Sequence, residues 1–224
     1  MPRLFSYLMT HDTGFAPNPF HGTLTLATCK PGIRRTKEVG DWVAGFASRA
    51  LVANSKMQGV LIPHQGLIYL MRIDKTIPLE EYFNTIEFQN KKPTPEINKL
   101  HNLANDYGDN IYYRDHHGMF QQLQNGNHDE DHMPQDTEGL NVLISDTFYY
   151  FGRNCPVLEA DLINSNFRIP VGPTYYGYQS SEDSICKILR LLHSKDYLPG
   201  VHGDPCLWGE KTNKLSCGSN CSIK

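Results

Sequence analysis

Four side chains in the first part of this sequence have the chemistry of proton carriers. Imidazoles and carboxylates transfer protons near neutral pH when their surroundings tune them. The candidates for such acid–base roles are His11, Asp12, Asp109 and His117. The sequence has no Ser-His-Asp order, no phosphate-binding Gly-rich loop and no Cys-x-x-Cys with a catalytic Glu. That absence favours binding over catalysis, and an enzyme is the alternative.

A second set of side chains is suited to holding a nucleotide or a base. Carboxylates and amides can pair with the polar edge of a base, aromatic rings can stack on it, and Arg suits a phosphate. The candidate ligand-binding residues are Asp12, Asn18, Phe20, Arg34, Arg35, Trp42, Asp109, Asn110, Tyr112 and Tyr149. If they form a pocket, Asp12→Ala and Asp109→Ala should weaken binding and leave the fold intact. In the alternative, the Asp and Asn of the 11–20 loop only fix turns.

The polar stretch 121–138 contains residues of the types that bind metals. His128, Asp129, Asp131 and His132 lie close together in sequence, and two His at i and i+4 would share a helix face. Gly126 and Pro134 bracket the stretch and argue against a helix, so a solvated surface loop is the alternative. Without metal, three side chains could line the mouth of a pocket as proton carriers: His117, His128 and Asp136.

The end of the chain offers a second possible metal site. His202, Cys206, Cys217 and Cys221 have the residue types of a structural zinc site. The Cys-x3-Cys spacing is looser than usual, so a tail with free thiols is the alternative. No other cofactor is required by any pattern in the sequence.

Short strands and a few helices must position these side chains. Apolar runs bounded by turn residues predict strands at 3–9, 24–29, 42–48, 67–73 and 141–145. Helices are predicted at 80–89 and 182–194, with a further short helix at 95–103. The aromatic run 148–151 should send one pair of rings into the core and leave the other available for stacking on a base. The fold class that follows is α+β, a mixed, mostly antiparallel β-barrel with peripheral helices.

Length, charge and cysteine content limit the classes of protein. The 224 residues predict one domain at 1–200 with a loop insert at 115–138, followed by a Cys-containing tail at 201–224. A net charge of −3 disfavours a protein that coats DNA, and favours a nucleotide or a short single strand over long duplex DNA. No apolar run predicts a membrane span or a signal peptide. Six Cys without a secretory signal predict reduced thiols in a cytoplasm.

Several motifs in a fixed order resemble a known family. They are Arg-Leu-Phe-Ser-Tyr at 3–7, His-Asp-Thr-Gly-Phe-Ala-Pro-Asn-Pro-Phe at 11–20, Cys-Lys-Pro-x-Ile-Arg-Arg at 29–35, Val-Gly-Asp-Trp-Val at 39–43, Tyr-Gly-Asp-Asn-Ile-Tyr at 107–112 and Leu-Ile-Ser-Asp-x-Phe-Tyr-Tyr-Phe-Gly at 143–152. Over residues 1 to about 152 the chain resembles the second of the nucleotide modification associated domain families. Its 36–83 segment also resembles small PUA-like barrels of the EVE and ASCH type.

The resemblance implies a link to nucleic-acid modification or to the contest between phage and host, in a bacterial or phage-encoded protein. Three functions are consistent with it. The first is binding of a nucleotide or a modified base without turnover. The second is an enzyme acting on a nucleotide or base, and the third is a soluble binder of a small signalling nucleotide. The oligomeric state is not predicted.

Overall fold

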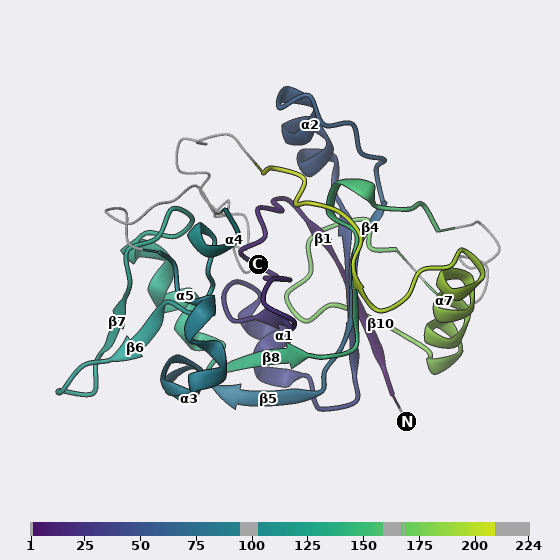
Figure 1. Ribbon diagram of the computed structural model, residues 1–224. Coiled ribbons are helices and arrows are strands. Elements are labelled where there is room, and N and C mark those ends of the chain that lie inside the picture. The colour runs from purple at the N-terminus through teal and green to yellow at the C-terminus, as the bar shows by residue number, and fades with distance from the viewer. Residues whose placement is uncertain (1, 95–102, 159–166, 168, 209–224) are drawn as a thin grey trace.

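The computed structural model describes residues 2–94, 103–158, 167 and 169–208 (Figure 1). The strands are β1 Leu4–Met9, β2 Leu24–Leu26, β3 Trp42–Ala47, β4 Leu67–Arg72, β5 Lys75–Pro78, β6 Tyr112–Arg114, β7 Phe120–Gln122, β8 Asn141–Ser145, β9 Phe148–Tyr150, β10 Tyr178–Ser180 and β11 Gly200–Val201. The α-helices are α1 Pro31–Thr36, α2 Arg49–Met57, α3 Leu79–Asn84, α4 Leu103–Asp106, α5 Met133–Glu138 and α7 Glu182–Ser194. Short 3-10 helices are η1 Ile86–Lys91, η3 Glu130–His132 and η4 Gly152–Asn154.

The largest sheet has the strand order β10-β1-β3-β4-β9-β11. Its central strands β3 and β4 are apolar runs, and every residue in them is buried except Arg72 at the end of β4. Strands β1 and β3 are parallel neighbours, with Leu4 opposite Trp42. Parallel neighbours need a crossover connection, so the chain must leave the sheet between them. That excursion carries β2 and α1.

A second core lies beside the large sheet (Figure 1). It is built around the three-stranded sheet β2-β8-β5 and the ribbon β6–β7. Buried side chains of this core include Phe15, Ile77, Phe88, Ile111 and Ile144. The segment 115–138, predicted as a loop, contains β7, η3 and α5. Pro134 lies in the first turn of α5, where its missing N–H costs no helix hydrogen bond.

The α+β class and the mixed pairing are as predicted from the sequence. Antiparallel pairs predominate among the described strands, and the parallel pairs are β1–β3 and β9–β11. The described strands form no closed barrel, because β10 and β11 lie at opposite edges of the large sheet and pair only with inner strands. The PUA-like barrel is therefore not confirmed.

Both longer helical predictions correspond to helices. Helix α7 covers 182–194, and its predicted apolar face is Ile185, Ile188, Leu189 and Leu192. Leu189 is partly buried, and the other three are buried. The 80–89 prediction is met by α3, which ends at Asn84 with Thr85 as its C-cap, and by the 3-10 helix η1 that follows. The helix predicted at 95–103 lies outside the described residues, apart from its last residue.

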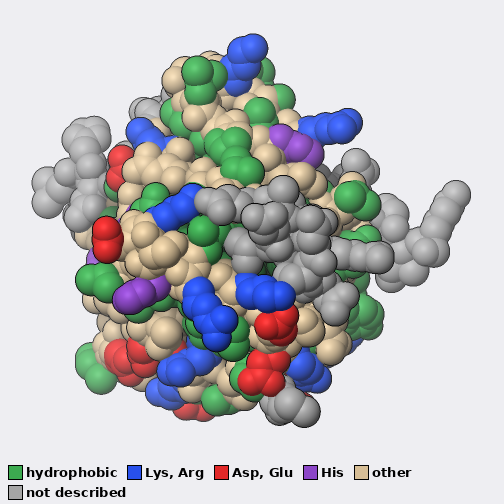
Figure 2. Space-filling model, turned by 90° about the vertical axis from the view of Figure 1, so that its right-hand side faces the viewer, with side chains coloured by type: hydrophobic (Ala, Val, Ile, Leu, Met, Phe, Trp, Pro, Cys, Tyr) green, Lys and Arg blue, Asp and Glu red, His purple; other side chains and the backbone are tan. Residues whose placement is uncertain are grey.

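The surface next to α7 and β10 carries mixed charges. Figure 2 shows Lys and Arg side chains interspersed with Asp and Glu on this face. No helix among the described ranges is long and apolar enough to cross a membrane.

Candidate active site

Cys29 lies in the crossover between β1 and β3, directly before Lys30, the N-cap of α1. Its backbone is left-handed, with φ 54°, which is rare for a residue with a side chain. The Cys29 N–H donates to Asp136 Oδ1 at 2.6 Å, and the Cys29 carbonyl accepts from Arg34 Nε at 2.7 Å. Strained residues held from both sides in this way are concentrated at functional sites.

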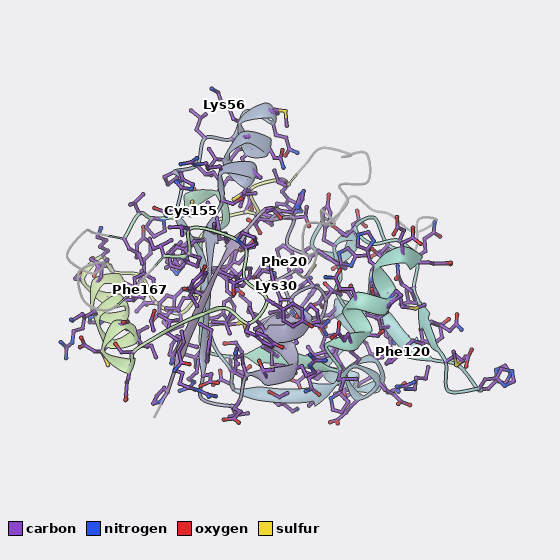
Figure 3. The ribbon with its side chains drawn as sticks, turned by 180° about the vertical axis from the view of Figure 1, so that it is seen from behind. Phe20, Lys30, Lys56, Phe120, Cys155 and Phe167 are labelled. Carbon is purple, nitrogen blue, oxygen red and sulfur yellow. The ribbon has the colours of Figure 1, made fainter. Side chains whose placement is uncertain are left out.

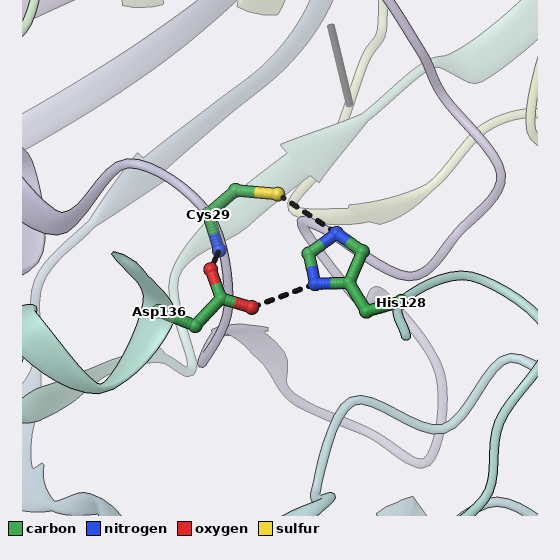
Figure 4. A group of neighbouring side chains, drawn as sticks. All are labelled: Cys29, His128 and Asp136. Carbon is green, nitrogen blue, oxygen red and sulfur yellow. Dashed lines mark hydrogen bonds and ion pairs between the residues drawn. The ribbon is translucent and has the colours of Figure 1, made fainter. Parts of the chain in front are cut away.

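Three side chains form a chain of contacts that begins at the Cys29 sulfur (Figure 4). Cys29 Sγ lies 3.5 Å from Nε2 of His128. The other ring nitrogen of His128, Nδ1, lies 2.6 Å from Asp136 Oδ2. A thiol, an imidazole and a carboxylate in this order match the arrangement that activates nucleophiles in unrelated enzymes.

Burial increases from the sulfur to the carboxylate. Cys29 is half-buried, whereas His128 is 5% and Asp136 is 2% exposed. The Asp136 carboxylate also accepts a hydrogen bond from the Tyr112 hydroxyl at 2.7 Å. Asp136 is therefore fixed by the second core, and it fixes the ring of His128 in turn.

The charges of this group stabilise one another. Burial alone would lower the pKa of His128, but the charge of the Cys29 sulfur and the hydrogen bond with Asp136 raise it to about 10. Burial would raise the pKa of Asp136, but the hydrogen bond and charge of His128 hold it below its usual range. At neutral pH the His128 ring is therefore protonated, and it lies between the Asp136 carboxylate and the Cys29 sulfur.

A cavity of about 960 Å³ opens beside the sulfur. Its walls come from β1, the 10–16 loop, the start of α1, the start of α2 and the 126–138 and 170–175 segments. Side chains that line it and could contact a ligand include Tyr7, His11, Cys29, Lys30, Arg49 and His132. Lys30 lies between the large sheet and the β6–β7 ribbon (Figure 3).

The candidate acid–base residues separate into two groups. His11 lines the cavity, and burial together with the nearby charge of His128 lowers its pKa. His117 lies in the exposed turn of the β6–β7 ribbon and does not line the cavity. Of the proton carriers proposed for a pocket mouth, His128 and Asp136 line it and His117 does not.

Asp12 points away from the cavity and into the core. Its carboxylate accepts hydrogen bonds from the Tyr150 hydroxyl at 2.5 Å and from the Cys206 N–H at 2.9 Å. Burial raises the pKa of Asp12. The carboxylate therefore joins the end of the described chain to the large sheet, and its ligand-binding role stays a prediction.

Asp109 is the centre of a second buried polar cluster. It accepts hydrogen bonds from Thr25 and Tyr82, both at 2.7 Å. The Lys91 ammonium in the same region donates to Asn18 Oδ1 at 3.0 Å, and the Asn18 amide donates to the Tyr107 carbonyl. These polar side chains are used to hold the second core together.

The remaining ligand-binding candidates also make contacts within the protein. Asn110 donates to the carbonyls of Tyr82 and Phe88, and fully buried Arg34 donates to three backbone carbonyls.

Arg35 pairs with Glu138 on the surface, and Phe20 stacks on Trp208. Trp42 and Tyr149 are buried in the large core, and Tyr112 binds Asp136. None of these residues lines the 960 Å³ cavity.

All four rings of the aromatic run 148–151 are buried, so neither pair is left exposed for a base. Tyr149, at 8%, is the most exposed of them. Tyr149 and Phe151 both stack on His202, with ring centroids 6.5 and 5.1 Å apart. The 200–208 segment covers this end of the sheet and explains the burial.

Of the four residues predicted as a zinc site at the end of the chain, the structure describes His202 and Cys206. His202 Nε2 lies 2.7 Å from the Leu198 carbonyl, and Cys206 is buried against Asp12. Cys217 and Cys221 lie outside the described residues, so the zinc site stays a prediction.

Near the cavity, His128 and His132 stack with ring centroids 4.4 Å apart, and His132 Nδ1 is 2.6 Å from Asp129. The donor atoms of Cys29, His128 and Asp136 lie within 4.8 Å of one another. Because Asp136 contacts the His128 nitrogen that faces away from the sulfur, this arrangement favours an activated thiol over three ligands around one ion.

Comparison with known families decides where the chain belongs. The family model for nucleotide modification associated domain 2 matches residues 1–212. The chain belongs to this family. Comparisons with curated proteins and with solved structures gave no match. In this member of the nucleotide modification associated domain 2 family, the Cys29 group and its cavity lie within the matched residues.

Reasoning from the sequence did not select Cys29, although it lies in the family-like motif at 29–35. Two local signals mark it: it follows a strand, and it precedes a helix with Pro in its first turn. A Cys with distant His and Asp residues is a candidate nucleophile. No local pattern links Cys29 to His128, because the two are 99 residues apart.

The ion pair of His128 makes the free energy of unfolding depend on pH. Its pKa is about 10 in the folded protein, against an ordinary value of 6.5. The stabilisation is complete below pH 6.5 and is lost as the pH rises toward 10. The stability difference between the native protein and His128→Gln should therefore shrink over this interval in urea titrations. A difference that stays constant would contradict the ion pair.

The native protein must be compared with His128→Gln because Lys91 also makes the free energy of unfolding depend on pH, in the opposite direction to His128. Burial lowers the pKa of Lys91 to about 8, although the charge of Asp109 opposes the shift. The cost of the buried ammonium is present below that pH and disappears as the pH rises. Both proteins contain Lys91, so its effect cancels in the difference.

Proposed function

We propose that this chain is an enzyme of nucleotide modification that uses Cys29 as a nucleophile. His128 donates and accepts the proton that moves in the reaction. Asp136 orients the His128 ring and stabilises its protonated form. The observation that carries the proposal is the 3.5 Å contact between Cys29 Sγ and His128 Nε2, with His128 Nδ1 held by buried Asp136. Membership of the nucleotide modification associated domain 2 family supports a nucleotide or base as the substrate class.

The geometry suits a transfer reaction at an electrophilic, trigonal carbon of the substrate. The Cys29 thiolate attacks this carbon and forms a C–S bond. The bond to the leaving group then breaks, and the His128 imidazolium gives its proton to the leaving group.

In the second half of the reaction, neutral His128 takes a proton from an acceptor, which is water or an amine. The acceptor oxygen or nitrogen displaces the sulfur, and the thiolate–imidazolium pair is restored. The sum exchanges one group on the carbon for another, with no change in oxidation state.

The proposal predicts unusual thiol reactivity at Cys29. The thiolate is the reactive form of cysteine, and at pH 6 an ordinary thiol is almost fully protonated. Brief treatment with iodoacetamide at pH 6 should therefore alkylate Cys29 roughly ten- to hundredfold faster than Cys186. Cys186 is exposed on α7 and is an internal control in the same sample. Peptide mass spectrometry measures each cysteine separately.

Two outcomes of this experiment bear on the proposal. His128→Gln should reduce the rate at Cys29 to that of Cys186, because no imidazolium then faces the sulfur. Equal rates at both cysteines in the native protein would refute an activated thiol. Two functions consistent with the family resemblance would then be left: binding of a nucleotide or modified base without turnover, and binding of a small signalling nucleotide.

A further inference from the structure

We infer that the cavity beside Cys29 takes a free mononucleotide, and that Lys30 and Arg49 hold its phosphate. The inference names the substrate of the proposed enzyme and in that respect rests on the proposed function. Its basis is the balance of charge around the cavity, which is independent of the chemistry at the sulfur.

The acidic side chains that line the cavity are already neutralised by the protein. Asp136 is paired with His128. Glu138 lies 3.0 Å from Arg35 Nη1 and accepts a hydrogen bond from the Tyr175 hydroxyl, also at 3.0 Å. Neither carboxylate is left to balance a further cation in the cavity.

The lysine and arginine side chains of the same lining have no such partners. Lys30 and Arg49 both line the cavity, and neither forms an ion pair with any residue in the described ranges. His11 and His64 line the cavity as well and add donors without negative charge. Lys30 and Arg49 therefore place positive charge on the cavity wall that no lining carboxylate balances, and this suits a phosphate.

Lys30 is placed to act close to the nucleophile. It directly follows Cys29, and its Nζ lies 4.6 Å from the centre of the Tyr7 ring, another residue of the lining. Its backbone is left-handed as well, with φ 42°. Lys30 is half-buried and lies near the middle of the view in Figure 3, whereas Lys56 extends from the outer end of α2. Lys56 is exposed and does not line the cavity, which makes it a matched control.

The size of the cavity also favours a free nucleotide over a base within a duplex. Its volume of about 960 Å³ is at the upper end of the range for pockets that enclose small ligands. Long duplex DNA would need a continuous basic surface. The chain has a net charge of −3, and the face in Figure 2 mixes both signs.

The test measures binding to the full chain carrying Cys29→Ser, so that no turnover occurs. Calorimetry compares the common 5′-deoxynucleoside monophosphates with their nucleosides and with inorganic phosphate. At least one monophosphate should bind roughly tenfold or more tightly than its nucleoside, because charged hydrogen bonds are made only to the phosphate. Added KCl should weaken binding of the monophosphate and leave the affinity for the nucleoside unchanged.

Three single substitutions test which residues bind the phosphate. Lys30→Gln and Arg49→Gln should each reduce monophosphate affinity about tenfold and leave nucleoside affinity unchanged, whereas Lys56→Gln should change neither. Equal binding of monophosphate and nucleoside would overturn the inference, as would no binding of any monophosphate at millimolar concentration. Inorganic phosphate binding as tightly as every monophosphate would overturn the mononucleotide assignment.

This test and the alkylation test can fail independently. Binding is measured without the Cys29 sulfur, so a failed phosphate site leaves the activated thiol standing. Equal alkylation rates at Cys29 and Cys186 would remove the nucleophile and leave the phosphate-binding cavity.

Discussion

Asp136→Ala is expected to lower the free energy of unfolding by roughly 3–5 kcal/mol, as removing one partner of a buried ion pair does. It should also abolish the fast alkylation of Cys29. The variant leaves the His128 imidazolium and the buried Arg34 guanidinium without their nearest anion. It also leaves the Tyr112 hydroxyl and the Cys29 N–H without acceptors. Urea titration and peptide mass spectrometry measure the two effects.

Two further variants separate charge from shape. Asp136→Asn keeps an oxygen acceptor but no negative charge, so it should fold better than Asp136→Ala and still lose the fast alkylation. Asp131→Ala removes an exposed carboxylate five residues away and should change neither property. If Asp136→Ala lowered the free energy of unfolding by less than about 1 kcal/mol, the charge of Asp136 would not be what holds Cys29 and His128 in place.

Asp109→Ala should have a similarly large effect on stability, again roughly 3–5 kcal/mol. The carboxylate is 1% exposed and accepts hydrogen bonds from Thr25 and Tyr82. Its charge also supports the buried Lys91 ammonium, whose pKa is lowered to about 8 by burial. Without Asp109, the buried Lys91 ammonium loses the negative charge that opposes its desolvation. Urea titration at pH 7 measures the loss.

This expectation replaces the one made from the sequence, in which Asp109→Ala weakened ligand binding and left the fold intact. Asp146→Ala is the matched control, because Asp146 is exposed and its carboxylate makes no hydrogen bond within the described ranges. A stable Asp109→Ala protein with weakened nucleotide binding would return Asp109 to the list of ligand contacts.

Elements with a clear local pattern could be predicted from the sequence. The spacing of Ile185, Ile188, Leu189 and Leu192 predicted the face of α7 that packs on the core, since residues three and four apart share one side of a helix. The continuous apolar run of β4 predicted a strand buried on both faces. The family motifs also depend on local order, and they led to the family that matches residues 1–212.

The role of each polar residue could not be predicted in the same way. Asp12, Asn18 and Asp109 have the right chemistry for a ligand, but in the folded chain their partners are other residues of the protein. Thr25, which binds Asp109, is 84 residues away in sequence. A carboxylate looks the same in sequence whether it faces a cavity or a buried hydroxyl.

The sequence by itself therefore determined the family, the α+β class and the main strands and helices of this protein. The tertiary structure decided that Cys29, His128 and Asp136 meet, since Asp136 is 107 residues from Cys29. They meet because the crossover from β1 to β3 packs against the 126–138 segment in the second core. Such long-range contacts arise from burial and complementary charge, which no local spacing records.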